Sequence, residues 1–156
     1  MATDVQANKA VVRGYVEHAF AEAARGNAAV FDDYFAPHYV NHTARHHAKN
    51  AQGLAGLKGY AQEVGRATQD FTVKADLLVA EGDMVTVHWT LRGSHGGQHQ
   101  HKHVGEVQPT QHELRVSGVA IFRVQDGKIT EGWNYDNVLD TLIEIGAIRV
   151  TSQSSP

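Results

Sequence analysis

The chain has 156 residues and a formal net charge of -3, so it can form one domain with a hydrophobic core and is too short for two. The charged residues are dispersed, which gives no basic surface for nucleic acid, and no run of about 18 apolar residues indicates a membrane span. The absence of cysteine excludes disulfides and thiolate chemistry. Together with an N-terminus that lacks a signal pattern, it predicts a cytoplasmic protein.

The first part of the chain predicts helices. Residues 3–25 carry an amphipathic pattern, with Thr3 and Gln6 as a capping box. Residues 27–35 predict a second, short helix that ends before Pro37. After a short extended segment and a polar loop, helical spacing returns from Leu54 to about Thr68.

From Phe71 the apolar spacing changes to alternation, which predicts strands. The first strand covers residues 71–79, with one face formed by Phe71, Val73, Ala75, Leu77 and Val79. A turn at 81–83 leads to a second strand over 85–91. Residues 93–111 are rich in glycine and histidine and predict a long loop or an irregular hairpin.

A central hairpin over residues 118–135 organises the rest of the chain. Its turn is Asp126-Gly127, a dipeptide that tolerates the positive φ angles of tight hairpins. One face carries small residues on the first strand and polar residues on the second, which predicts the wall of a cavity. That wall comprises Gly118, Ala120, Phe122, Asn134 and Asp136.

A last short helix spans residues 139–145. Helices followed by strands indicate an α+β fold, with N-terminal helices packed on a curved, mainly antiparallel sheet. We expect a single domain over residues 1–148 and a disordered tail over 149–156.

Several short motifs, in this order and spacing, resemble the SnoaL-like, polyketide-cyclase-like branch of the NTF2-like superfamily. They are Tyr39-Val-Asn-His42, Glu81-Gly-Asp83, Gly93-Ser-His95, Pro109-Thr110, Ile121-Phe-Arg123, Asp126-Gly-Lys-Ile129 and Glu131-Gly-Trp133. The resemblance implies a cone that encloses a deep pocket, and a homodimer.

The resemblance also bears on chemistry. The superfamily contains cyclases, isomerases, dehydratases, epoxide hydrolases and binding proteins without catalytic activity. In the cyclases an aspartate acts as acid or base at the position of Asn134, and a histidine stands at the position of Ala120. Asn41 matches a pocket asparagine of those enzymes.

Three histidines are candidates for proton transfer, because imidazole titrates near neutral pH. His42 follows the second helix and is expected at the pocket wall; the alternative is a structural histidine bonded to a backbone carbonyl. His88 lies on the polar face of its strand, which either lines the cone or faces solvent. His95 has glycine neighbours that could bring it over the pocket as a lid, or leave it exposed.

Asp136 could supply a carboxylate near Asn134, since residues two apart share one face of a strand. The alternative is a helix cap at residues 136–137. Four tyrosines lie on or near inward faces and can pack or polarise a carbonyl: Tyr15, Tyr34, Tyr39 and Tyr60.

His99, His101 and His103 alternate and could share one face of a strand around a divalent metal. Because this run contains a lysine and no carboxylate, we favour a solvated loop and expect no metal site. The same holds for His46 and His47.

The sequence therefore predicts an enzyme without cofactor that encloses a small, largely apolar organic molecule. His42, His88, Asn134 and Asp136 are the catalytic candidates. The candidates for substrate binding are Tyr15, Tyr39, Asn41, Tyr60, His95, Gly118, Ala120 and Phe122. A binding protein without catalysis, and an epoxide or ester hydrolase, remain alternatives.

Overall fold

The computed structural model describes residues 4–43, 52–101 and 104–151. The expectations for Thr3, His46, His47, His103 and the last five residues lie outside this part of the chain. The remaining elements can be compared with the sequence one by one.

The predicted first helix is confirmed as one continuous helical run made of α1 (Val5–Gly14), a π-helical turn (Tyr15–Ala19) and α2 (Phe20–Ala24). Its N-cap is Asp4, whose Oδ1 accepts hydrogen bonds from the amides of Gln6 and Ala7, both at 3.0 Å. The π-helical turn lies in the middle of the helix and places Tyr15 in the core.

The second helix is a 3-10 helix over Ala28–Asp33, and Asn27 makes no side-chain capping bond to it. Strand β1 (Phe35–Asn41) begins earlier than expected and contains Pro37. This proline is compatible with the strand because β1 lies at the edge of the sheet, where an amide can be left out of the ladder. Helix α3 (Leu54–Ala67) agrees with the predicted third helix.

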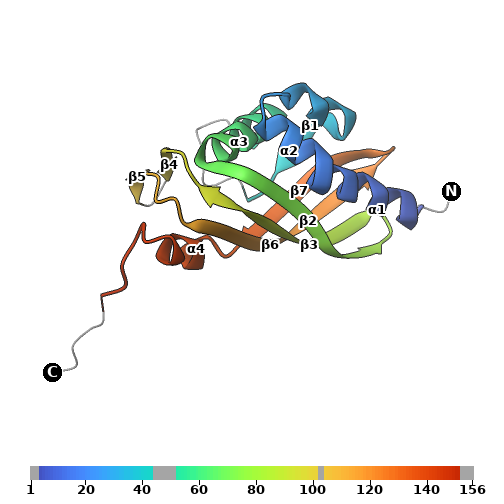
Figure 1. Ribbon diagram of the computed structural model, residues 1–156. Coiled ribbons are helices and arrows are strands. Elements are labelled where there is room, and N and C mark those ends of the chain that lie inside the picture. The colour runs from blue at the N-terminus through green and yellow to red at the C-terminus, as the bar shows by residue number, and fades with distance from the viewer. Residues whose placement is uncertain (1–3, 44–51, 102–103, 152–156) are drawn as a thin grey trace.

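One mixed, mainly antiparallel sheet forms the body of the molecule. Its strand order is β1-β7-β6-β3-β2, with β1 parallel to β7 and every other pair antiparallel. The long strands are β2 (Thr68–Glu81), β3 (Met84–His95), β6 (Glu113–Gln125) and β7 (Lys128–Asp136). The N-terminal helices and α3 cover one face of this twisted sheet, as Figure 1 shows. The predicted α+β architecture is confirmed.

The predicted face of the first strand is wrong in its second half. A β-bulge at Asp76 interrupts the pairing of β2 with β3 and changes the phase of the alternation. Ala75 is buried, whereas Leu77 and Val79 are 61% and 59% exposed on the outer face of the sheet. Leu78 and Ala80 replace them on the inner face, where they pack against the core.

The central hairpin is confirmed. Both turn residues adopt positive φ angles, 50° at Asp126 and 74° at Gly127. Ala120 pairs with Asn134 and Gly118 pairs with Asp136, so the expected wall residues lie side by side. Ala120 is 2% exposed, which places this face of the hairpin toward the interior.

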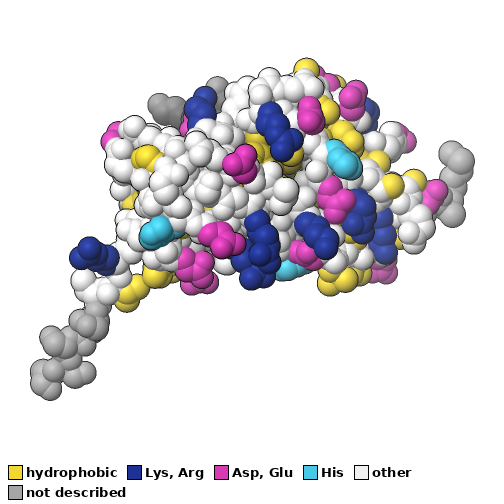
Figure 2. Space-filling model, in the orientation of Figure 1, with side chains coloured by type: hydrophobic (Ala, Val, Ile, Leu, Met, Phe, Trp, Pro, Cys, Tyr) yellow, Lys and Arg dark blue, Asp and Glu magenta, His cyan; other side chains and the backbone are white. Residues whose placement is uncertain are grey.

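Three short elements cluster at one end of the sheet (Figure 1): the hairpin of β4 (His99–His101) and β5 (Gly105–Val107), and helix α4 (Val138–Glu144). Basic and acidic side chains are interspersed on the face shown in Figure 2. Across the described residues, none of the helices combines the length and apolar character needed to cross a bilayer.

The packing of α3 on α2 depends on Gly65 and yields a stability prediction. A Cβ at Gly65 would collide with the Ala24 carbonyl, so Gly65→Ala should lower the free energy of unfolding by about 1–3 kcal/mol. Gly59 lies on the same helix with no atom near its Cβ position. Gly59→Ala should therefore raise stability by about 0.5–1 kcal/mol. Urea denaturation measures both, and equal effects would contradict the packing.

Candidate functional site

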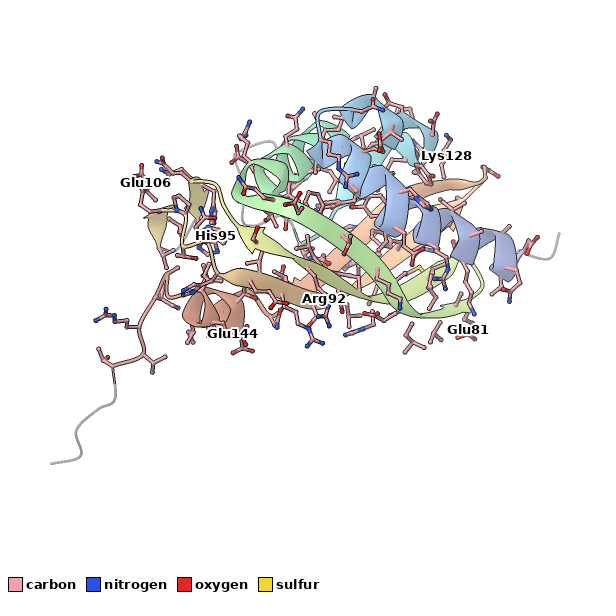
Figure 3. The ribbon with its side chains drawn as sticks, in the orientation of Figure 1. Glu81, Arg92, His95, Glu106, Lys128 and Glu144 are labelled. Atoms are coloured by element: carbon pink, nitrogen blue, oxygen red, sulfur yellow. The ribbon has the colours of Figure 1, made fainter. Side chains whose placement is uncertain are left out.

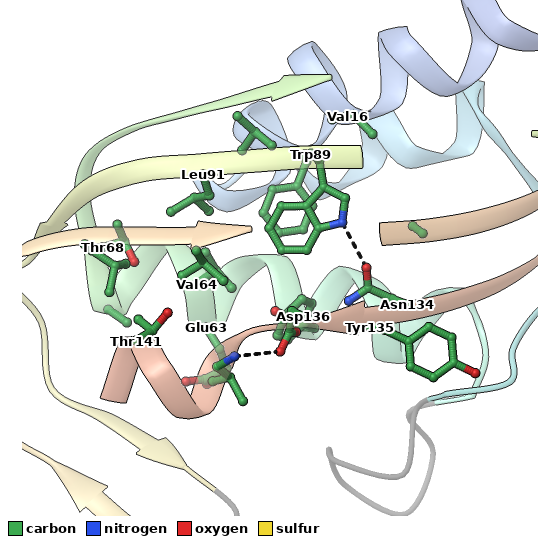
Figure 4. Close-up of a pocket in the computed structure, with 18 of the residues that line it drawn as sticks. Val16, Glu63, Val64, Thr68, Trp89, Leu91, Asn134, Tyr135, Asp136 and Thr141 are labelled. Carbon is green, nitrogen blue, oxygen red and sulfur yellow. Dashed lines mark hydrogen bonds between the residues drawn. The ribbon is translucent and has the colours of Figure 1, made fainter. Parts of the chain in front are cut away.

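A cavity of about 570 Å³ lies between the helices and the inner face of the sheet, within the size range of small-molecule sites. Apolar side chains, including Phe20, form most of its wall. Figure 4 shows three of them, Val16, Val64 and Leu91. A smaller set of polar residues also lines it: Tyr15, Tyr39, Asn41, Tyr60, Glu63, Thr68, His95, His99, Gln100, His101, Asn134, Tyr135, Asp136 and Thr141.

The predicted wall on the central hairpin forms one side of this cavity. Ala120, Phe122 and Asn134 line it directly. Gly118 lies behind the lining, because the Trp89 indole occupies the space where a side chain of residue 118 would lie. A Cβ at Gly118 would collide with the Tyr135 backbone carbonyl and would lie 2.7 Å from the indole ring, so the close packing of Trp89 on this strand requires glycine.

Trp89 fixes the orientation of the Asn134 amide. The indole Nε1 lies 3.1 Å from the Asn134 Oδ1, as Figure 4 shows. An indole nitrogen only donates hydrogen bonds, so the atom facing it must be the amide oxygen. The Nδ2 group of Asn134 is then left to donate toward the cavity.

Hydrogen bonds also fix the orientation of the side-chain amide of Asn41, which lies on the neighbouring strand β1. Its Oδ1 accepts from the Thr43 amide at 3.1 Å and lies 3.0 Å from the Thr43 hydroxyl. The Thr43 hydroxyl oxygen accepts a hydrogen bond from the backbone amide of Asn134 at 2.8 Å, so the hydroxyl hydrogen is available to Asn41. The oxygen of Asn41 is therefore saturated and its Nδ2 group remains as a second donor.

Three tyrosines converge on the cavity from the helices and from β1. Burial raises the pKa of Tyr15 and of Tyr39 well above the ordinary phenol value. Burial, followed by the nearby Asp136 carboxylate, raises the pKa of Tyr60 to about 12. All three are thus neutral hydrogen-bonding groups at physiological pH. Tyr34, in contrast, is not part of the lining.

Asp136 lies both at the cavity and at the start of helix α4. It lines the cavity, and its Oδ1 accepts from the Val138 amide at 3.2 Å at the start of α4. Asn137 makes no capping bond, since its Oδ1 accepts from the Ser117 amide at 2.9 Å. Because Asp136 is exposed and also lines the cavity, we place it at the opening of the cavity.

His95 and His99 form a pair at the end of the cavity near β4 and β5 (Figure 3 labels His95). His95 is 1% exposed, and its Nε2 lies 3.3 Å from the Nδ1 of His99. Burial lowers the pKa of both imidazoles, and the neighbouring His99 and His112 lower that of His95 further. The Gly97 carbonyl opposes the shift at His99.

The alternatives of a mobile lid or an exposed loop do not describe His95. The Gly97 amide donates to the Ala67 carbonyl at 3.1 Å, and a Cβ at Gly97 would collide with the Arg66 carbonyl. The glycines of this segment therefore permit close packing of the loop against the end of α3.

His42 and His88 are not among the residues that line the cavity, which differs from the pocket-wall position expected for His42 and agrees with the solvent-facing alternative for His88. His42 stacks on Trp133, which is itself a lining residue, and the His42 Nε2 lies 2.8 Å from the Glu131 Oε2. His88 points outward, 3.4 Å from Asp76, with 45% of its side chain exposed. Both fall on the strand phase opposite to the inner wall.

No three His, Asp or Glu side chains within residues 4–43, 52–101 and 104–151 come together as a metal site requires. Sequence reasoning missed Trp89, Thr43, Thr110 and His99 as contributors to the site. Trp89 could have been found, because it lies in phase with the buried Val85 and Val87 on one strand. The contacts of Thr43 and Thr110 join distant segments and leave no local signal.

A family model described as SnoaL-like polyketide cyclase matches residues 10–145. No curated protein gives a significant match.

Solved structures with the same fold include a protein of Jannaschia sp. CCS1, provisionally named a SnoaL-like polyketide cyclase. It has a TM-score of 0.76 and 18% identity, over 96% of this chain and 98% of that one. TsrD of Streptomyces laurentii has a TM-score of 0.75 and 19% identity, over 93% and 98%. AclR of Streptomyces galilaeus, provisionally named a hydroxylase, has a TM-score of 0.73 and 20% identity, over 96% and 87%.

The raised pKa of Tyr60 predicts a loss of stability in alkali. The unfolded chain releases this proton near pH 10 and the folded chain near pH 12, so the free energy of unfolding should fall as the pH rises between them. Tyr60→Phe should make that fall shallower, whereas Tyr135→Phe, at a side chain that is 61% exposed, should not. Urea denaturation at stepwise pH measures the slopes; identical slopes for all three proteins would contradict the burial of Tyr60.

Proposed function

The chain belongs to the SnoaL-like polyketide cyclase family, and from that premise we propose that it is an acid–base enzyme acting on a small, largely apolar molecule that carries a carbonyl or hydroxyl group. Cyclisation, isomerisation and dehydration all begin with proton transfer next to such a group. The observation that carries the proposal is the pair of amides, Asn41 and Asn134, whose oxygens are held by hydrogen-bond donors.

These two amides suit a substrate oxygen that gains negative charge. Asn41 pairs with Gly132 across the β1–β7 ladder, and Thr43 bridges the Asn41 side chain to the Asn134 backbone. The two Nδ2 groups are thus held by neighbouring strands on one side of the cavity. Fixed donors stabilise an oxyanion without having to reorganise during the reaction, which commonly makes this the largest catalytic contribution.

Asp136 is the proton acceptor in this proposal. A carboxylate oxygen takes the proton from the carbon next to the carbonyl, and the C–H electron pair forms a carbon–carbon double bond as charge moves to the oxygen held by Asn41 and Asn134. The protonated carboxyl then returns the proton to carbon or to a leaving hydroxyl. Asn134 cannot accept the proton, because an amide has no protonation equilibrium near neutral pH.

The alternative is a binding protein on the same fold. The neutral tyrosines and amides would hold a ligand equally well without a base, and Asp136 would serve only as the helix cap. The two possibilities differ in whether removing the Asp136 charge abolishes chemistry or leaves everything unchanged.

Deuterium exchange decides between them. Aromatic ketones incubated with the protein in deuterium oxide should incorporate deuterium at the carbon next to the carbonyl, measured by proton NMR. Asp136→Asn keeps an oxygen for the Val138 amide and should lower the exchange rate by about 10²–10⁴. Asp140→Asn, an exposed residue of α4 outside the lining, is the matched control and should not change it. Ketone binding without exchange would support the binding protein instead.

The outer face of the sheet supports the predicted homodimer. Leu77, His88, Val119 and Tyr135 pair in register across four strands and form one transverse row. Three of the four are apolar or aromatic and exposed, at 61%, 38% and 61% for Leu77, Val119 and Tyr135. A contiguous exposed patch of this kind commonly marks an interface, and a second copy of the same sheet presents the same apolar row to it.

Charge placed in this row should prevent self-association. Leu77→Glu is expected to shift the protein from dimer to monomer in analytical ultracentrifugation, because burying an unpaired carboxylate is costly. Leu139→Glu is the matched control, since Leu139 is also 61% exposed but lies on α4. A monomeric unmodified protein, or a dimer that survives Leu77→Glu, would contradict this interface.

A further inference from the structure

The histidine pair at the far end of the cavity has no part in the reaction above, and its hydrogen bonds fix where its protons lie. The Thr110 backbone amide donates to the Nδ1 of His95 at 3.2 Å. A backbone amide cannot accept, so Nδ1 of His95 must be the unprotonated nitrogen. The Thr110 hydroxyl accepts from the His112 amide and lies 3.1 Å from the same Nδ1, to which it can donate.

The proton of His95 therefore lies on Nε2, which faces the Nδ1 of His99 at 3.3 Å. Protonating His95 at Nδ1 would oppose the Thr110 amide, so the ring is held neutral. Its Nε2–H then donates to Nδ1 of His99, which leaves the proton of a neutral His99 on Nε2. The Gly97 carbonyl, the other partner of the His99 ring, is the competing acceptor for a His99 proton. The edge-on arrangement of the rings, 88° between planes, agrees with this donation.

His95 is well suited to fix its neighbour. Its backbone amide donates to the His112 carbonyl at 2.9 Å, and its carbonyl accepts from the Gln111 amide at 2.9 Å. With both the main chain and the imidazole held, the direction of its Nε2–H cannot change without loss of several bonds.

We infer that His99 is a ligand-binding residue whose Nε2–H donates to an oxygen of the ligand, and that His95 is the positioning residue that orients it. His99 lines the cavity, and Nε2 is the ring nitrogen that His95 leaves unused. This contact is a matter of binding, and it holds whether or not the cavity catalyses proton transfer.

The position of the pair defines the class of ligand. Trp89, beside Asn134, and His95 are six residues apart on β3, and a strand of that length covers about 20 Å. Apolar side chains, including Leu91, Leu114 and Val116, line the cavity between these positions. The structure therefore fits an elongated apolar molecule with a hydrogen-bond acceptor near each end, one for Asn41 and Asn134 and one for His99.

The first test is the tautomer itself, read by ¹⁵N NMR of histidine-labelled protein at neutral pH, with assignments from His95→Gln and His99→Gln. We expect both His95 and His99 to carry a single proton on Nε2. Thr110→Val keeps the backbone amide and should leave both tautomers unchanged. A proton on Nδ1 of His99, for instance shared with the Gly97 carbonyl, would overturn the inference.

The second test measures binding of linear aryl diketones of increasing length, each beside its monoketone analogue, by isothermal titration calorimetry. At one length or more, the second carbonyl should strengthen binding about two- to tenfold, the usual net contribution of one hydrogen bond. His99→Leu should abolish that gain, and His99→Gln, which keeps a donor, should restore part of it.

His38→Leu removes an exposed histidine of β1 that does not line the cavity and should keep the full gain. A gain that persists in His99→Leu, or no gain at any length, would overturn the inference. Because no turnover is measured, failure here is distinct from failure of the deuterium exchange.

Discussion

The hydrogen bond from the Trp89 indole to Asn134 is the contact on which the cavity depends. It requires glycine at position 118, since the indole occupies the volume of any side chain there. It also requires β3, β6 and β7 to be adjacent in that order, because Trp89 pairs with Gly118 and Gly118 with Asp136. The indole nitrogen of Trp89, which can only donate, thus links β3 to β7 across β6. It also determines that the Nδ2 group of Asn134 is the end of the side-chain amide that faces the ligand.

Much of this arrangement could be predicted from local patterns. The turn and the alternation predict the hairpin over residues 118–135, and the prediction that Ala120 and Asn134 share an inner wall is confirmed. Side chains alternate between the two faces of a strand, so the correct phase of one hairpin fixes the face to which each of its side chains points. The family resemblance added the cone and the expectation of a pocket.

The errors arose where phase is set by distant contacts. The bulge at Asp76 reverses the faces of Leu77 and Val79, and the continuous apolar run over residues 77–80 does not show which of its side chains face inward. His88 was assigned to either face because alternation alone cannot say which face is inner. Its neighbours Val87 and Trp89 settle that question, since both pack into the interior. His42 follows the last residue of β1, and only the parallel pairing of β1 with β7 brings it onto Trp133.

Asparagine at position 134 changes the chemistry of its strand. A carboxylate there would also accept the Trp89 hydrogen bond, and its second oxygen would be a proton acceptor beside the ligand. With asparagine, the second atom is a donor, so the same position stabilises negative charge and the proton must be accepted elsewhere. Asp136 is the nearest carboxylate on the same face of β7, two residues toward the cavity opening. In the proposed reaction, Asn134 stabilises the charge and Asp136 accepts the proton at separate positions along one strand, and the reacting carbon is expected to lie between residues 134 and 136.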